Sequence, residues 1–527
     1  MTDGVPPAPP EKEVHQDEAS KVLGRVAVGA SLMVAARFVI RGLSIIGMLV
    51  LARLLVAEDF GLVALSGAAV AFVEVLSVTN YGLLLVRERQ PTRDLYDTAF
   101  TLNILRCLLI GLLIASTAHW QAHFLGDARI AGVLQVVSLI IILDGLTSIG
   151  MVRLQRDLHF DSLFRFQVVS KVVAFVVSVI LALILQNYWS LVLGNLAARL
   201  VAIPYSYWLA PHQPRLSLRN AGQLLQFSGW MLGINALTTV DSQGPNLLLG
   251  RLLGLPALGT YQVAYFVAAM PVHEVAVPVR QPIYAGYAEV QGDRTLLREH
   301  FLDGFGLLAA VMVPLSVGIA LTAPEIGRIA LGPAWADAIS LIALCALYSL
   351  ADCLAGFSTN IFFVLDRMRP YVKTLALLVL LRMALIPLAI LQWGVVGMAT
   401  VMVGTAVLNA VLWHWQTASL LGHRLIDIAF EAWRSMAAAC VMVAAVLALR
   451  TILPDTALSL ARAAFNLCLL SVAGAAVHIG TQYLLWRLAG RPKGAERRVL
   501  SAATGLMRRL GWRVLAPATR AGTMKER

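Results

Sequence analysis

The chain has 527 residues, of which 59% are hydrophobic and only 14% are charged, whereas about a quarter of the residues in a soluble domain are charged. Together with a mean hydropathy of +0.76, this composition excludes an ordinary soluble protein. The net charge of +12 does not indicate a nucleic-acid partner, because the basic residues cluster in short loops and in the C-terminal tail without interleaved aromatic side chains.

Residues 1–24 are rich in proline and charge, and we expect them to form a disordered cytoplasmic tail and not a signal peptide. Beyond them, apolar runs of about 20 residues recur, the length that an α-helix needs to cross a bilayer. The pattern predicts an all-α membrane protein with about 14 transmembrane helices. The predicted spans are 30–51, 61–86, 97–118, 130–152, 166–186, 188–209, 226–250, 258–282, 301–324, 338–365, 371–392, 394–416, 434–452 and 463–486.

Basic residues favour one side of the predicted membrane. The loops after even-numbered spans carry groups such as Arg153, Arg156 and Arg165, whereas the other loops carry isolated arginines such as Arg53 and Arg251. Because cytoplasmic loops of membrane proteins hold an excess of lysine and arginine, this asymmetry places both termini in the cytoplasm. The basic stretch 491–527 is then a cytoplasmic tail, either disordered or folded as an amphipathic helix on the anionic inner leaflet.

A short internal repeat links the two halves of the chain. The stretch LARLLVAEDFGLVALS at 51–66 is echoed by LGRLLGLPALGTYQVA at 249–264, so that Gly61 aligns with Gly259, 198 residues later. Six predicted spans separate the copies, and six is even. The two halves would therefore share one orientation and be related by a pseudo-two-fold axis along the membrane normal, which is one of the plans used by secondary transporters.

No motif in the chain indicates catalysis, a metal or a cofactor. There is no P-loop and no GxSxG nucleophile motif, and the five cysteines lie within apolar runs without a CxxC or CxxH pattern. A membrane polymerase or ligase that acts on lipid-linked sugars would need a substantial extracytoplasmic loop, whereas the predicted connections are short. We therefore expect the protein not to be an enzyme and to need no cofactor.

Ionisable residues deep in the predicted spans are the candidate functional residues. Each would cost about 2.5–3.5 kcal/mol near the centre of a lipid-facing helix, so these side chains must face one another or a wet cavity. Cations dominate the first half and would suit an anionic ligand, whereas acids dominate the second half and could carry protons or Na⁺. The candidate ligand-binding cations are Arg37, Arg41, Arg106, Arg199, Arg280 and Arg382, and the candidate ion-coupling acids are Glu74, Asp144, Asp241, Glu274 and Asp352.

One other interpretation of these charges stays open. Any one arginine could simply join two helices, for example Arg41 with Glu74 or Arg106 with Asp144. Lys171 and Lys373 are left out of the candidates, because both lie near predicted cytoplasmic span ends, from which a lysine side chain can reach the interface.

The stretch from residue 49 to residue 106, which contains ARLLVAEDFGLVALS, resembles the opening of the bacterial polysaccharide transporters, the O-antigen and exopolysaccharide flippases. LQRDLHF at 154–160 resembles the same family, and the similarity extends roughly over the first twelve predicted spans. This family is similar to the multidrug/oligosaccharidyl-lipid/polysaccharide exporters. It has no short catalytic signature, so no functional residue can be transferred to this chain by motif.

The resemblance implies a fold of two six-helix bundles that form a V, here 25–210 and 211–420, followed by two additional transmembrane helices in 421–490. It also implies an activity: flipping oligosaccharide repeat units linked to undecaprenyl pyrophosphate across the bacterial inner membrane by alternating access, coupled to H⁺ or Na⁺. Candidate partners are then this lipid-linked oligosaccharide, membrane lipids, a polysaccharide polymerase and a chain-length regulator. The alternatives are a multidrug or cation antiporter of the same superfamily, and a membrane polymerase or ligase.

Overall fold

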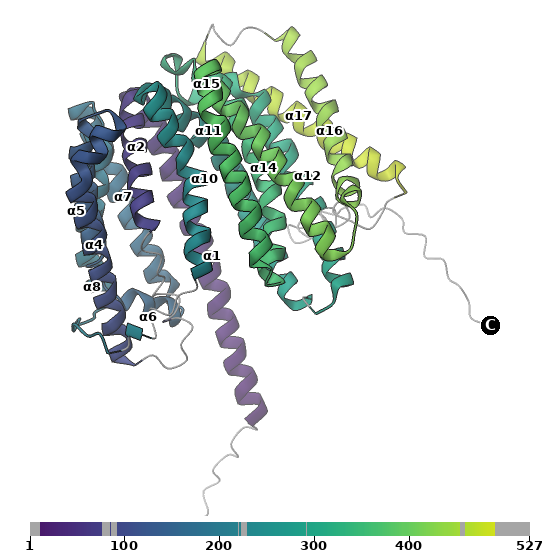
Figure 1. The fold of residues 1–527 in the computed structure, drawn as a ribbon. Coiled ribbons are helices and arrows are strands. Elements are labelled where there is room, and N and C mark those ends of the chain that lie inside the picture. Colours follow the sequence, from purple (N-terminus) through teal and green to yellow (C-terminus); the bar gives the residue numbers. More distant parts are fainter. Residues whose placement is uncertain are drawn as a thin grey trace, which may run out of the picture. The chain divides into compact units, whose positions relative to one another are not determined.

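The computed structural model describes residues 11–75, 85, 92–219, 221–222, 229–290, 292–453 and 459–490. Apart from short turns and connecting segments, these residues are helical (Figure 1). The described helices are α1 (Glu11–Leu54), α2 (Ala57–Glu74), α4 (Arg93–Leu125), α5 (Arg129–Asp144), α6 (Gly150–Arg156), α7 (Phe160–Leu185), α8 (Trp189–Leu209), α10 (Gly229–Leu253), α11 (Leu255–Val290), α12 (Arg294–Leu321), α13 (Ala323–Ala330), a 3-10 turn at Pro333–Trp335, α14 (Ala338–Val364), α15 (Met368–Leu421), α16 (Leu425–Ile452) and α17 (Leu460–Leu488).

Within the described ranges, nine helical segments are long and apolar enough to cross a membrane, which confirms an all-helical membrane protein. They are Ser31–Leu54 of α1, Leu255–Gln281 of α11, and the helices α4, α7, α12, α14, α15, α16 and α17. The number of about 14 transmembrane helices stays a prediction. So do the five predicted domain ranges: α1 already begins at Glu11, within the predicted tail, and residues 491–527 lie outside the described part.

The 54-residue helix α15 contains a break that the sequence pattern predicts. Gly394 has φ +61° and ψ −143°, a conformation that only glycine adopts readily, so the peptide plane turns there and the helical hydrogen bonding is interrupted. The break falls between the predicted spans 371–392 and 394–416. A second φ of +70°, at Gly422, ends the helix in the left-handed cap that glycine favours.

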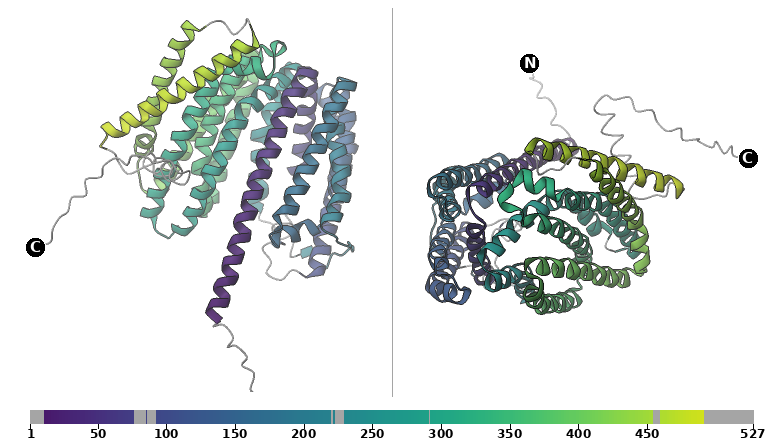
Figure 2. Two further views of the ribbon diagram at one scale, coloured as in Figure 1. Left: turned by 180° about the vertical axis from the view of Figure 1, so that it is seen from behind. Right: turned by 90° about the horizontal axis from the view of Figure 1, so that it is seen from above.

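The chain forms two compact units. Unit 1 comprises residues 1–263, 330–334 and 375–398, and unit 2 comprises 264–329, 335–374 and 399–527. In unit 1, α4 packs against α5, α7 packs against both α8 and α1, and α10 packs against α2. In unit 2, α12 is the central helix and contacts α14, α16 and α17. The long helix α1, purple in Figure 2, lies in unit 1.

The two copies of the internal repeat meet inside unit 1. A Cβ at Gly61 of α2 would lie 1.9 Å from the carbonyl oxygen of Leu255, and a Cβ at Gly259 of α11 would lie 1.7 Å from the carbonyl oxygen of Ala57. Ala57 and Leu255 are the first residues of their helices and are themselves equivalent in the repeat. The contact is therefore reciprocal, as expected at a local two-fold axis, and it brings the backbones of the two first helical turns together.

We predict that Gly61→Ala and Gly259→Ala each destabilise the protein. One methyl group in a filled space costs about 1–3 kcal/mol, and here the obstacle is backbone that cannot rotate away, so the loss falls at or above the upper end of that range. The measurement is the thermal unfolding temperature and the yield of monodisperse protein in detergent.

Gly67→Ala is the matched control, because Gly67 lies on the same helix α2 and a Cβ there would meet nothing within 4 Å. Since alanine favours a helix by about 1 kcal/mol over glycine, this variant should be at least as stable as the wild type. Equal stability of all three variants would contradict the close contact.

Candidate functional site

The helices α1 and α7 pack side by side in parallel. A Cβ at Gly29 of α1 would lie 1.9 Å from the Phe160 ring of α7, and a Cβ at Gly47 would lie 3.1 Å from the Phe175 ring. Residue numbers increase from the first contact to the second on both helices, so the helices run in the same direction. The two glycines let the phenylalanine rings lie directly against the backbone of α1, which fixes the register between the helices.

This register places two cations at the same level. Arg41 lies two thirds of the way from the first glycine contact to the second on α1, and Lys171 lies at nearly the same fraction of the matching stretch of α7. The Lys171 ammonium accordingly lies within electrostatic range of the Arg41 guanidinium. Lys171 is half-buried, whereas Arg41 is exposed in the isolated chain.

Lys171 is a candidate that the sequence analysis missed. It was assigned to a span end because hydropathy places the start of its span at residue 166, but α7 begins at Phe160 and Lys171 is the twelfth of its 26 residues. At 1.5 Å per residue it therefore lies more than three helical turns from the start of α7. If the position of Lys171 is measured from the start of the helix and not from the start of the apolar run, Lys171 is identified as a cation in the middle of a helix.

A second cluster gathers charges from α2, α4, α5 and α8. The Arg199 guanidinium of α8 lies 2.6 Å from a carboxylate oxygen of Asp144, at the end of α5. Close packing holds α4 against this point, because a Cβ at Gly145 would lie 2.8 Å from the Cβ of Cys107. On α4, the Arg106 guanidinium donates to the amide oxygen of Asn103 over 3.1 Å.

Glu74 completes this cluster. Its carboxylate, at the end of α2, lies within electrostatic range of both Arg106 and Asp144. Asp144 therefore pairs with Arg199, and Glu74 lies near Arg106. The pairings considered from sequence, Arg41 with Glu74 and Arg106 with Asp144, stay predictions, and Asp144 is engaged by Arg199. The cluster balances two cations against two acids.

Arg382 and Asp241 form a buried pair in unit 1. The guanidinium of Arg382, on α15, lies 2.7 Å from an Asp241 carboxylate oxygen on α10, and the arginine side chain is only 2% exposed. The small residue Gly244 lets the Met383 side chain lie against α10 one turn away. Paired and enclosed in this way, Arg382 joins two helices, and removing either partner would leave a buried charge.

The candidates of unit 2 lie between α11 and α14. Arg280 donates to the main-chain carbonyl oxygen of Gly356 over 2.7 Å. Asp352 lies within electrostatic range of the Tyr265 hydroxyl and of the Cys353 thiol. Glu274, one and a half turns before Arg280 on α11, is half-buried.

The remaining candidate, Arg37, lies on α1 in unit 1, one turn before Arg41, and is half-buried as well.

An ion-paired arginine also supports the repeat contact from outside the membrane segments. The Arg129 guanidinium lies 2.6 Å from Asp127 and also pairs with Glu58 in the first turn of α2. The hydrogen bond that Arg129 donates holds the pKa of the Asp127 carboxyl below its usual range. These residues line a cavity of about 290 Å³ together with the second repeat copy, including Arg251 and Leu255.

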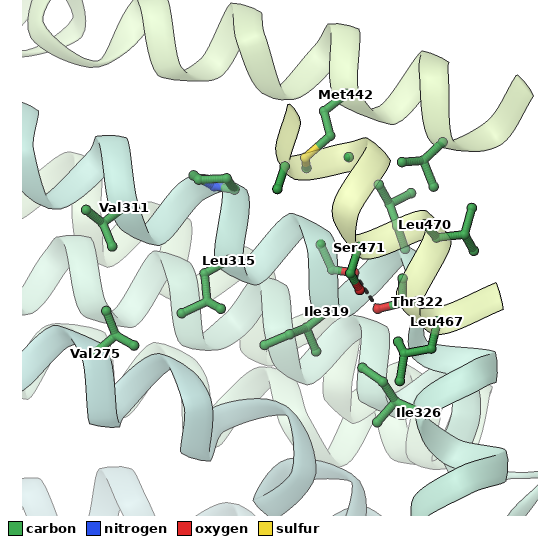
Figure 3. Close-up of a pocket in the computed structure, with 16 residues that line it drawn as sticks. Val275, Val311, Leu315, Ile319, Thr322, Ile326, Met442, Leu467, Leu470 and Ser471 are labelled. Atoms are coloured by element: carbon green, nitrogen blue, oxygen red, sulfur yellow. Dashed lines mark hydrogen bonds between the residues drawn. The ribbon is translucent and has the colours of Figure 1, made fainter. Parts of the chain in front are cut away.

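A larger cavity of about 530 Å³ lies in unit 2 between α12, α16 and α17 (Figure 3). Its wall is almost wholly aliphatic, with Leu315, Ile319 and Leu470 among the side chains that point into it, and the hydroxyls of Thr322 and Ser471 at one end. The Thr322 hydroxyl donates to the carbonyl oxygen of Gly318 in its own helix. None of the residues that line this cavity is a cation, so it offers a phosphate no partner.

The fold and the charged clusters define a multi-pass helical membrane protein of a transporter type. Residues 50–340, more than half of the chain, match the family described as polysaccharide biosynthesis protein. The chain therefore belongs to that family.

Two relatives and two solved structures agree with this assignment. The succinoglycan biosynthesis transport protein ExoT of Rhizobium meliloti is 25% identical over 308 residues, which cover 58% of this chain and 62% of the relative. The lipopolysaccharide biosynthesis protein WzxC of Escherichia coli is 22% identical over 331 residues, 61% of this chain and 66% of the relative. Each match spans less than two thirds of the relative.

The inward closed structure of the lipid II flippase MurJ has a TM-score of 0.68 at 14% identity and covers 87% of this chain and 100% of its own. An inward-facing multidrug resistance transporter of the MATE family has a TM-score of 0.55 at 12% identity, over 72% of this chain and 94% of its own. The fold is thus shared with both. These matches place the chain among membrane transport proteins and not among enzymes, as its sequence predicted.

We predict that Arg382→Met destabilises the protein and that Asp241→Asn added to it restores part of the loss. Removing one member of a buried pair costs about 3–5 kcal/mol, and the partial exposure of Asp241 puts this case at the lower end. Thermal unfolding in detergent measures both variants.

Arg369→Met serves as the control, because Arg369 lies on the same helix α15 but is exposed. It should unfold at the wild-type temperature. A double variant less stable than Arg382→Met alone would contradict the assignment of Arg382 and Asp241 as one interacting pair.

Proposed function

We propose that this protein flips undecaprenyl-pyrophosphate-linked oligosaccharide repeat units across the bacterial inner membrane, for exopolysaccharide or lipopolysaccharide biosynthesis. The observation that carries the proposal is the pair of arginines one turn apart on α1, Arg37 and Arg41, within a segment long and apolar enough to span a bilayer. Family membership and the fold shared with a lipid II flippase support it.

The physical reason is the charge of the head group. A pyrophosphate diester carries about two negative charges and cannot enter hydrocarbon without partners. Arginine offers a planar, permanently charged fork of donors that binds phosphate oxygens in pairs. Arg37 and Arg41, at i and i+4, present this fork twice on one side of α1. The lipid chain would remain in the bilayer while the head group and the sugars pass.

The contacts of the other candidate arginines suggest a different role for each of them. Arg199 and Arg382 are held by carboxylates at 2.6 and 2.7 Å, and Arg280 is held by a main-chain carbonyl oxygen. Their first role is to join helices. Arg106, on α4 and within electrostatic range of Glu74, is our candidate for a second contact with the head group, because its guanidinium lies among the charges that gather from α2, α4, α5 and α8.

Coupling to H⁺ or Na⁺ is part of the proposal. Glu74, Asp144, Asp241, Glu274 and Asp352 are the candidate acids, and two of them, Asp144 and Asp241, form ion pairs with arginines that a bound cation would have to displace. Alternating access requires the two six-helix bundles, 25–210 and 211–420, to open in turn toward each side. Both termini would lie in the cytoplasm. A polymerase and a chain-length regulator would act on the flipped product at the opposite face of the membrane.

A drug or cation antiporter is the second candidate, favoured by the fold shared with a MATE transporter. The charge of the α1–α7 contact argues against it, because two cations at one level would repel a cationic drug.

The experiment deletes the gene in its own host and restores it on a plasmid. The wild-type protein should restore the surface polysaccharide, whereas Arg41→Ala should lower it at least about tenfold, the loss expected when a charge-assisted contact is removed. Lipid-linked repeat units should then accumulate on the inner leaflet.

The exposed residue Arg369 provides the control, as Arg369→Ala should restore polysaccharide fully. Protein levels in the membrane are compared by immunoblot. Normal polysaccharide in the deletion strain, together with impaired drug efflux, would instead support the antiporter.

A further inference from the structure

We propose that the turn between α15 and α16, residues 422–424, is a proton-operated latch: neutral His423 keeps the turn closed, and protonated His423 opens it. The inference goes beyond the proposed function, because the latch would operate whatever the protein transports. The turn lies in unit 2, on the side of the membrane that the loop charges predict to be cytoplasmic. Acidity on that side would then control the contact between α12 and α16.

His423 is enclosed by the protein, although its ring nitrogens are not satisfied there. It follows Gly422, the left-handed cap of α15, and is only 9% exposed. The imidazole lies against the fully buried ring of Phe301 on α12, with 5.9 Å between the ring centroids. Neither Nδ1 nor Nε2 has a hydrogen-bond partner among the described residues. This position suits an imidazolium less than a neutral ring, because an imidazolium has two N–H donors and a charge to satisfy.

The charged and titratable groups around His423 come from three helices. Arg298 of α12 and Asp427 of α16 lie within electrostatic range of its ring, and so does His414 of α15. The Asp427 carboxylate accepts from the Arg298 guanidinium over 3.2 Å and from the main-chain N–H of Arg424 over 2.9 Å. It therefore ties α16 to α12 and caps the first turn of α16. This carboxylate is already engaged, whereas the charge of Arg298 repels a proton on the ring.

His414 is placed differently from His423. Its Nδ1 meets the hydroxyl of Ser358 on α14, and the ring of Phe305 lies against it with 4.7 Å between the centroids. It lies about two turns inside α15, so opening of the turn does not bring it to water. His423 follows the end of α15 and reaches water as soon as the turn opens. The proton is therefore assigned to His423.

The direction of the pH response follows from the pKa of His423. Burial lowers this pKa below the ordinary value of about 6.5, and the charge of Arg298 lowers it further, against the opposing effect of Asp427. In the open turn the ring meets water and the pKa returns to its ordinary value. The closed form is therefore fully stable above about pH 6.5 and loses stability as the pH falls from there toward the pKa of the closed form.

Opening of the latch would loosen the start of α16. Only three residues, 422–424, connect α15 to α16, so a movement of His423 carries Arg424 with it. The main-chain N–H of Arg424 then leaves the Asp427 carboxylate, which removes the cap of α16. The same carboxylate holds Arg298, so the tie between α12 and α16 is weakened at the same point.

The test measures amide hydrogen exchange of the purified full chain in nanodiscs by mass spectrometry. The pH is lowered from about 7.5 to about 5.5, on either side of the ordinary histidine pKa, and rates are corrected for the intrinsic effect of pH on exchange. Protection of residues 418–428 in the wild type should fall at least about threefold and up to about tenfold, since one proton shifts the equilibrium at most tenfold per pH unit. His423→Leu should keep its protection unchanged, because it fills the site with an apolar side chain that does not titrate.

His300→Leu is the matched control. His300 lies on α12 two residues after Arg298, and its Nδ1 donates to the carbonyl oxygen of Leu296 in its own helix over 2.9 Å. This variant should keep the wild-type response. Unfolding temperature and monodispersity establish that each variant is folded, and His423→Met is a second apolar variant for the same site.

Two results would overturn the latch. One is wild-type protection of residues 418–428 that stays the same on acidification, which needs no variant to be observed. The other is a loss of protection that persists in folded His423→Leu or His423→Met, which would assign the proton to another group. Neither result depends on transport, so the latch and the proposed function stand or fall separately.

Discussion

The reciprocal contact of Gly61 and Gly259 is the constraint on which the described part of unit 1 depends. Each glycine faces the first main-chain carbonyl of the opposite helix, so α2 and α11 approach as closely as backbones can. Helix α10 leads directly into α11 and packs on α2, and the ion pairs of Arg129 reach the first turn of α2. The charged residues on α2 are positioned by this crossing, because a shift of α2 would carry Glu74 with it.

The interior charges of the described helices serve two different purposes. Some are neutralised where they lie, as in Arg199 with Asp144 and Arg382 with Asp241. Others, such as Arg41 and Lys171, bring like charges of two helices within electrostatic range of each other, and in the proposed function Arg41 contacts the anionic head group. A charge in an apolar layer must find a partner.

Much of the fold could be predicted from the sequence, because apolar runs and short motifs are local signals. The repeat identified Gly61 and Gly259 as equivalent, and the predicted boundary near residue 393 coincides with the break at Gly394. The partners of the charges could not be predicted, since helix neighbours far apart in sequence leave no periodic trace. Lys171 was missed for a local reason: α7 begins six residues before the predicted span.

The glycine crossing also bears on how a duplicated gene can diverge. After a duplication, the two halves are normally free to change independently, each adapting to its own neighbours. In this protein each copy packs against the other, so a larger residue at Gly61 or Gly259 would disturb the packing of both halves. We therefore expect drift to be slowest around residues 57–61 and 255–259, where the two copies pack against each other.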